Sequence, residues 1–216
     1  MIVHNLDTSN SVLNHFISEI RDVNVQKDSM RFRRNIERIG EILSYEMSRK
    51  LDFRTNEVQT PLGLKNVPLV ADKLVLCSVL RAGLPLHQGV LNYFDQIENA
   101  FISAYRHHTT AEDFEIKVEY LASPSLEGKT LILVDPMLAT GRSLVAVQEA
   151  LKKIGEAKQV HLISVIAAQE GIDYISAYFP ENSHLWVATV DPELNSKGYI
   201  VPGLGDAGDL AFGNKL

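Results

Sequence analysis

The chain has 216 residues, of which 45% are apolar and 22% are charged, and its net charge is −6. This balance is typical of a globular protein and excludes intrinsic disorder, collagen-like repeats and disulfide-rich mini-domains. The net negative charge disfavours a protein that coats DNA, so we expect no nucleic-acid partner. The longest apolar stretches fall far short of the roughly 18 residues that a membrane span requires, so we expect no membrane partner.

The single cysteine excludes an intramolecular disulfide, and its position in the apolar run 74–80 predicts a buried structural thiol. The first ten residues lack the basic and apolar regions of a secretory signal, so we expect a cytoplasmic protein. Residues 1–70 carry 10 basic and 9 acidic side chains, whereas residues 71–216 carry 11 and 18. We interpret the one basic cluster, RFRRNIER at 31–38, as a solvated helix face.

We predict that the first ~70 residues are helical. Two segments place apolar side chains three or four positions apart, as one face of a helix requires. We expect Ser9 or Asn10 to cap the first helix, and Asp28 or Ser29 to cap the second. The predicted apolar faces consist of Val12, Leu13, Phe16, Ile17 and Ile20 in the first helix, and Phe32, Ile36, Ile39, Leu43 and Met47 in the second.

From residue 74 onward, apolar strands alternate with helices, which predicts a mainly parallel α/β sheet with right-handed crossovers. One segment, EIKVEYL at 115–121, alternates strictly, and we interpret it as one arm of an antiparallel flap over about 107–125. Ligands in such folds bind at the carboxyl ends of the strands. The other predicted strands are 74–79, 100–106, 130–135, 160–168 and 184–190, and the predicted helices are one running through Val90 to Phe94, one at 143–155 and one at 170–179.

The segment LILVDPMLATGRSLVAV at 131–147 combines a buried strand, a short loop and a helix start. The unpaired N–H groups and partial positive charge of a helix N-terminus, with the Thr140 and Ser143 hydroxyls, suit a phosphate monoester. Gly141 lets the backbone approach the anion closely. Asp135 repels phosphate but suits a pair of sugar hydroxyls, so the segment predicts a ribose 5-phosphate site. The glycine spacing does not fit a Walker A loop.

The string VDPMLATGRS resembles the binding motif for phosphoribosyl diphosphate (PRPP) of type I phosphoribosyltransferases. The proline after the first acid resembles the uracil phosphoribosyltransferase family in particular. Arg142 departs from the glycine common in that family, so contact with phosphate and exposure to solvent both stay open for it. By this resemblance the PRPP-binding residues here are Asp135, Pro136, Met137, Leu138, Ala139, Thr140, Gly141, Arg142 and Ser143.

The C-terminal segment GYIVPGLGDAGDLAFG at 198–213 contains a literal G-x-G-x-x-G. Only eight residues follow its last glycine, which excludes a dinucleotide-binding fold. An irregular backbone with free N–H and C=O groups suits a flat nucleobase, and a cytosine in a uracil pocket would leave buried groups unpaired. The segment also resembles the uracil-binding signature of the family. The resemblance implies that Ile200, Gly205, Asp206 and Ala207 hold the base and that Asp206 also lies near the ribose of PRPP.

Two arginines each stand at or just after the end of a predicted strand, Arg81 in VLRAG and Arg106 in SAYR. Arginine donates two hydrogen bonds at once to phosphate oxygens, which favours diphosphate binding. Both positions resemble the family's diphosphate-contacting arginines. The polar stretch HHTTAEDF that follows Arg106 is interpreted as a mobile flap, with its two histidines on the surface.

The resemblance implies one phosphoribosyltransferase domain over 1–216, with a helical part at 1–70, an α/β core at 71–190 and a base-binding hood at 191–216. It implies conversion of uracil and PRPP to UMP and diphosphate, a step of pyrimidine salvage. Arg81, Arg106 and Asp206 are the expected catalytic residues, and Mg²⁺ is expected to arrive with PRPP. No dedicated metal site is expected.

Family members are dimers or tetramers, some activated by GTP, so we expect a homodimer or homotetramer with GTP as a candidate activator. Two alternatives stay open. One is a phosphoribosyltransferase for another base, and the other is an RNA-binding regulator on the same fold, which the charge of residues 71–216 disfavours.

Overall fold

The computed structural model describes residues 1–108 and 114–215, and it describes side chains for all of these except 105–108 and 114–116. Its centre is an eight-stranded sheet in the order β1-β10-β9-β7-β4-β5-β6, with the short β8 paired to β9. The β5–β6 pair is antiparallel and the other pairs are parallel, as predicted. The strands are β1 (Ile2–Asn5), β4 (Leu74–Leu80), β5 (Glu98–His108), β6 (Phe114–Ala122), β7 (Thr130–Val134), β8 (Met137–Leu138), β9 (Gln159–Ala168) and β10 (His184–Asp191).

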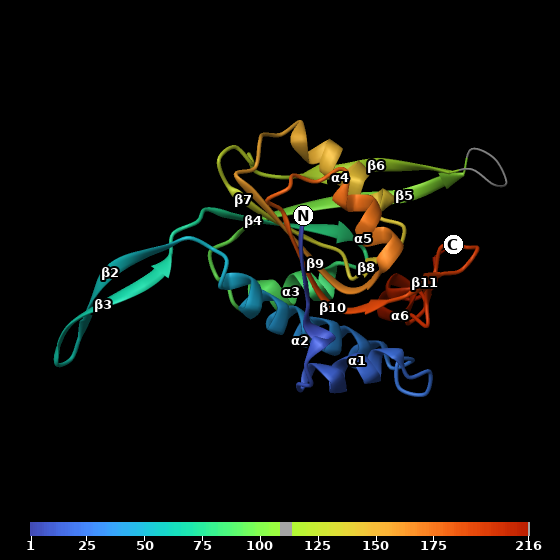
Figure 1. Cartoon of the computed structure of the whole chain (residues 1–216), viewed down its shortest axis with the longest axis horizontal. Coiled ribbons are helices and arrows are strands. Elements are labelled where there is room, and N and C mark those ends of the chain that lie inside the picture. The colour runs from blue at the N-terminus through green and yellow to red at the C-terminus, as the bar shows by residue number, and fades with distance from the viewer. Residues whose placement is uncertain (109–113, 216) are drawn as a thin grey trace.

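Helices cover both faces of this sheet (Figure 1). The central strands β4, β7 and β9 are mostly apolar because successive side chains point to opposite faces and both faces are buried. The helices of one face are α1 (Leu13–Arg21), α2 (Ser29–Ser48) and α3 (Leu84–Leu91), and those of the other are α4 (Arg142–Lys152) and α5 (Gln169–Ser176).

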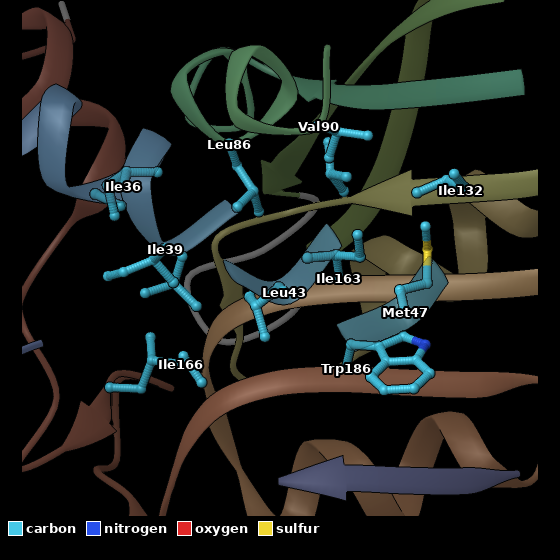
Figure 2. Packing of buried hydrophobic residues seen from close by; sticks show 14 of the residues in the cluster. Ile36, Ile39, Leu43, Met47, Leu86, Val90, Ile132, Ile163, Ile166 and Trp186 are labelled. Atoms are coloured by element: carbon cyan, nitrogen blue, oxygen red, sulfur yellow. The ribbon is translucent and has the colours of Figure 1, made fainter. Parts of the chain in front are cut away.

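The α2 helix forms the largest part of one apolar layer. Its predicted stripe is buried, and Figure 2 shows Leu43 and Met47 packed against Ile163 and Trp186 of the sheet. Asp28 caps this helix by accepting hydrogen bonds from the N–H groups of residues 30 and 31, as predicted. On the other face Cys77 is fully buried, as predicted, and this burial raises the pKa of its thiol to about 12, which disfavours a nucleophilic thiolate.

The prediction of helix through the first ~70 residues is wrong in two places. Residues 53–70 form a hairpin of β2 (Phe53–Thr60) and β3 (Gly63–Val70), and β1 adds an edge strand to the sheet. The hairpin turn is held by the Thr60 hydroxyl, which accepts hydrogen bonds from the N–H groups of Leu62 and Gly63. The ribbon extends away from the sheet (Figure 1). Its side chains are mostly exposed, so no apolar alternation marks it in the sequence.

The first helix also starts later than predicted, because Ser11 and not Ser9 or Asn10 accepts a hydrogen bond at its start, from the N–H of Leu13. Val12 is exposed, while Leu13, Ile17 and Ile20 are buried as expected. The remaining elements are a 3-10 turn (Leu6–Thr8), β11 (Glu193–Leu194), β12 (Ile200–Val201) and α6 (Ala207–Phe212). No helix in the described residues is long and apolar enough to cross a membrane.

Candidate functional site

A cleft of about 660 Å³ opens at the carboxyl ends of β4 and β7, where an α/β sheet is expected to bind its ligands. Segments from four parts of the chain meet there: the turn after β4, the middle of β5, the loop between β7 and α4, and the C-terminal hood. The residues that border the cleft are Val79, Leu80, Arg81, Ala82, Ser103, Ala104, Asp135, Met137, Leu138, Ala139, Thr140, Gly141, Ser143, Leu144, Gly198, Tyr199, Asp206, Ala207, Gly208 and Lys215.

The loop between β7 and α4 forms one wall, as its sequence predicts. Gly141 has a left-handed φ of 76° and directly precedes α4. A Cβ at this position would lie 2.6 Å from Cγ2 of Ile175, so only glycine fits. Thr140 and Ser143 border the cleft beside the first turn of α4. The N–H groups of that turn have no partners within the helix, so the wall is suited to an anion.

Asp135 stands at the end of β7 and accepts a hydrogen bond from the N–H of Met137 at 3.2 Å. Burial raises the pKa of this carboxyl to about 7, and the Met137 hydrogen bond opposes that shift only in part. An incompletely ionised carboxyl at the edge of an anion-binding loop can accept hydrogen bonds from hydroxyl groups without strong repulsion of a neighbouring phosphate. This arrangement agrees with the ribose role that the sequence suggests.

Arg81 also borders the cleft, in the turn after β4 and next to a cis peptide bond between Leu80 and Arg81. Its guanidinium donates a hydrogen bond to the carbonyl of Gly213 at 3.1 Å and lies 3.6 Å from a carboxylate oxygen of Asp209. Lys215 makes a similar contact, with Nζ at 3.4 Å from Oδ2 of Asp206. Arg81 and Lys215 therefore both border the cleft and contact carboxylates of the C-terminal hood. The side chain of Lys215 is 63% exposed.

The hood closes the cleft with α6 and the turn before it. Asp206 caps α6 by accepting a hydrogen bond from the N–H of Asp209 at 3.0 Å, and the N–H of Ala207 lies 3.4 Å from the sulfur of Met137. The Ile200 side chain is buried in the apolar core, and neither Ile200 nor Gly205 borders the cleft. Gly205 has a φ of 92°, and a Cβ at this position would have no other atom within 4 Å.

Two other predicted site residues, Pro136 and Arg142, do not border the cleft, and a third, Arg106, has a side chain that the structure does not describe. Pro136 is buried, and its carbonyl accepts hydrogen bonds from the N–H groups of Val165 and Ile166. Arg142 has an exposed side chain at the start of α4. Arg106 lies in β5 opposite Ile116 of β6, but its side chain is outside the described part of the chain, as are residues 109–113 of the predicted flap.

Comparisons with known proteins decide the family. Residues 7–214 match the family model described as uracil phosphoribosyltransferase. A protein of that name from Porphyromonas gingivalis is 50% identical over 216 residues, with all of both chains covered. Another from Thermococcus gammatolerans is 41% identical over 203 residues, which are 93% of this chain and 88% of its own. The chain belongs to the uracil phosphoribosyltransferase family.

Solved structures share the fold of this chain. The AQ2163 protein from Aquifex aeolicus superposes with a TM-score of 0.87 at 30% identity, covering all of both chains. A hypoxanthine phosphoribosyltransferase from Staphylococcus aureus superposes with a TM-score of 0.51 at 14% identity, covering 86% of this chain and 83% of its own. The second likeness shows the shared phosphoribosyltransferase fold alone. The α/β fold expected from the sequence is thus confirmed, and as a member of its family the chain is a phosphoribosyltransferase.

Within this family member, two of the four arginines of the basic cluster 31–38 form ion pairs with neighbouring glutamates. Arg31 pairs with Glu19 at 3.3 Å, and Arg34 pairs with Glu37 at 2.6 Å. Arg33 instead donates a hydrogen bond to the carbonyl of Ala211 in α6 at 2.6 Å. The exposed ion pairs confirm a solvated helix face, whereas the Arg33 contact, which ties α2 to the hood, had no signal in the sequence.

Among the cleft residues that sequence reasoning missed, three have polar side chains, namely Ser103, Tyr199 and Lys215. Ser103 lies inside a predicted strand, and the other two lie in the predicted hood, but no motif distinguishes them from their neighbours. In the described part of the chain, no group of three or more His, Cys, Asp or Glu side chains could hold a metal ion.

Proposed function

We propose that the cleft binds PRPP and uracil and converts them to UMP and diphosphate. The observation that carries this proposal is the meeting of three parts in one cleft: the anion-binding loop at 139–143, the carboxyl of Asp135 and the hood segment 206–208. In the reaction a ring nitrogen of uracil forms a bond to C1 of the ribose as the bond from C1 to the diphosphate oxygen breaks. The proton of that ring nitrogen leaves to a base, for which Asp206 is the candidate.

The 5′-phosphate of PRPP would occupy the wall formed by Thr140, Gly141 and Ser143. Its ribose hydroxyls would donate hydrogen bonds to Asp135. These two contacts would bring C1 of the ribose toward Arg81, whose guanidinium is suited to the diphosphate. Arg106 is proposed for the same role from its position in β5. Both cations would stabilise the charge that develops on the leaving diphosphate.

The base would lie against the hood, where Ala207 borders the cleft and Gly205 follows the turn at 203–204. We propose that backbone groups of residues 200–207 recognise the ring edge of uracil. Because Ile200 packs into the core, its contribution would come from backbone atoms. Met137 and Leu138 would line the site without a hydrogen bond to the substrate.

Mg²⁺ would enter as part of the PRPP substrate, since each diphosphate group binds this cation strongly and oxygen ligands suit it. The reaction would serve pyrimidine salvage. GTP activation and a cytoplasmic location stay predictions of the sequence.

The decisive experiment mixes the purified protein with PRPP, Mg²⁺ and one base at a time, namely uracil, cytosine, orotate, adenine or hypoxanthine. Nucleotide and diphosphate are measured together. Turnover with uracil alone is the expected result. Turnover with another base would keep the reaction class and refute the base assignment. PRPP binding without turnover would favour a regulator or a requirement for GTP, and a repeat with GTP separates these two.

We propose further that the chain forms a homodimer or homotetramer through the β2–β3 hairpin. An isolated two-stranded ribbon is marginally stable in water. This ribbon exposes several large apolar side chains, which a second copy would cover. Sedimentation of the whole chain and of a Leu64→Lys variant tests the proposal, because the charge should dissociate the oligomer. The exposed apolar side chains are Phe53, Val58, Leu62, Leu64, Leu69 and Val70.

A further inference from the structure

A buried ion pair lies directly behind the turn of the hood. Arg21, in the last turn of α1, contacts Asp191 at the end of β10 through two hydrogen bonds of 2.8 and 2.7 Å. The side chain of Asp191 is 7% exposed and that of Arg21 is 22% exposed. The pair therefore joins the N-terminal helices to the strand from which the hood emerges.

The same pair holds both polar backbone groups of Gly203. The N–H of Gly203 donates to Asp191 at 2.8 Å, and its carbonyl accepts from Arg21 at 3.0 Å. Gly203 has a φ of 62°, and a Cβ there would lie 2.1 Å from the carbonyl oxygen of Ile200. The turn thus needs glycine at this position, and a charged pair fixes where the glycine sits.

The next residues of the hood are held from both sides. The carbonyl of Leu204 accepts a hydrogen bond from the side chain of Gln26 at 3.1 Å, and Asp206 is fixed as the cap of α6. The hydrogen bonds described above therefore involve Gly203, Leu204 and Asp206, but not Gly205. Consequently, the location of the turn that precedes Ala207 is set largely by Arg21, Asp191 and Gln26.

Stability of the fold does not by itself explain the pair of Arg21 and Asp191. Removing two charges from water costs several kcal/mol per ion, so a buried pair adds little net stability compared with apolar side chains. Burial by itself would raise the pKa of Asp191, but hydrogen bonds from Arg21 and Gly203 outweigh it and hold that pKa below its ordinary value. Asp191 is therefore negatively charged at neutral pH and forms an ion pair with Arg21.

We propose that Arg21 and Asp191 are positioning residues for the base, which fix the hood turn at the distance from PRPP that the reaction needs. This inference rests on the proposed function. Neither residue touches the cleft, so they act through Gly203. A displacement of about 1 Å in a reacting group can cost roughly a hundredfold in rate, so a small shift of the turn is enough to lower activity.

The test compares Arg21→Met and Arg21→Lys with Arg31→Lys as the matched control. Lysine keeps the charge at position 21 but loses the planar fork that contacts Asp191 and Gly203 together. Arg31 also joins α1 to α2, through Glu19, and has no contact with the hood among those described. A general loss of N-terminal packing would therefore affect position 31 as well as position 21.

We expect KM for uracil to rise about tenfold or more in Arg21→Met and less in Arg21→Lys, while KM for PRPP stays within about twofold. The control should change neither constant. Equal KM values for uracil in all variants, or equal rises in both KM values, would refute the positioning role. Loss of activity in proportion to the unfolded fraction would refute it too.

Hydrogen exchange separates this inference from the proposed function. Peptides that cover residues 199–206 should exchange faster in both Arg21 variants and unchanged in Arg31→Lys, whether or not the protein turns over uracil. Wild-type protein that turns over no uracil, with or without GTP, would refute the proposed function. Unchanged exchange in the Arg21 variants would refute the positioning role by itself.

Discussion

Replacing Asp135 by asparagine should stabilise the fold while it removes activity. Asparagine keeps an oxygen for the Met137 N–H and has the same shape, but it carries no charge to bury. The pKa of Asp135 is raised by burial to about 7 from an ordinary value of 3.8. Between these two values the folded state binds a proton more readily than the unfolded state, so the carboxyl lowers stability as the pH rises through this window.

The size of the gain follows from the shift. At 1.36 kcal/mol per pKa unit, the carboxyl lowers the free energy of unfolding by at most about 4 kcal/mol at pH 8. Because Asp135 borders the open cleft, water screens part of this cost, and we expect about 2 kcal/mol. At pH 4.5 the expected cost shrinks to about 0.5 kcal/mol, since the group is protonated in the folded state.

Thermal unfolding at the two pH values, without substrate, measures this gain. For a chain of this length, about 2 kcal/mol corresponds to a rise in Tm of roughly 4–8 °C at pH 8. Asp95→Asn, at an exposed position, is the control and should leave Tm nearly unchanged. A variant that is less stable than the wild type at pH 8, or equally changed at both pH values, would refute the reasoning. Turnover should fall by at least a hundredfold, because asparagine cannot accept hydrogen bonds with both of its terminal atoms.

Three more substitutions probe the site and the fold. Gly141→Ala should raise KM for PRPP at least tenfold, whereas Gly128→Ala, also at positive φ but with open space around it, should leave KM unchanged and lower Tm only slightly. Lys215→Met should raise KM for PRPP by about threefold to tenfold and weaken the salt dependence of PRPP binding, measured by calorimetry. Asp72→Asn should cost about 1–3 kcal/mol at pH 7 in denaturant unfolding, because its buried carboxylate accepts a hydrogen bond from Lys158 at 2.9 Å. Burial alone would raise the pKa of Asp72, but its hydrogen bonds outweigh burial and lower that pKa, so the cost should disappear as the pH falls through the lowered value.

The parts of the site that are local in sequence could be predicted from it. The strand, loop and helix at 130–152 are contiguous, so residue type and spacing suffice to place Asp135 at a strand end and Gly141 at a helix start. The buried strands and the α2 stripe were predictable for the same reason, since side-chain period follows directly from backbone geometry. The hairpin at 53–70 was not, because its exposed faces leave no apolar period to read.

The sequence by itself determined the alternating sheet, the anion-binding loop and the resemblance to the family. Only the tertiary structure brought Lys215 and Tyr199 to the cleft, sent the Ile200 side chain into the core and joined Arg21 to Asp191 across 170 residues of chain. It also decided the pKa of Asp135, which depends on burial rather than on neighbours in sequence. Backbone geometry repeats over a few residues and can be read locally, whereas burial and long-range pairing exist only after distant segments have packed together.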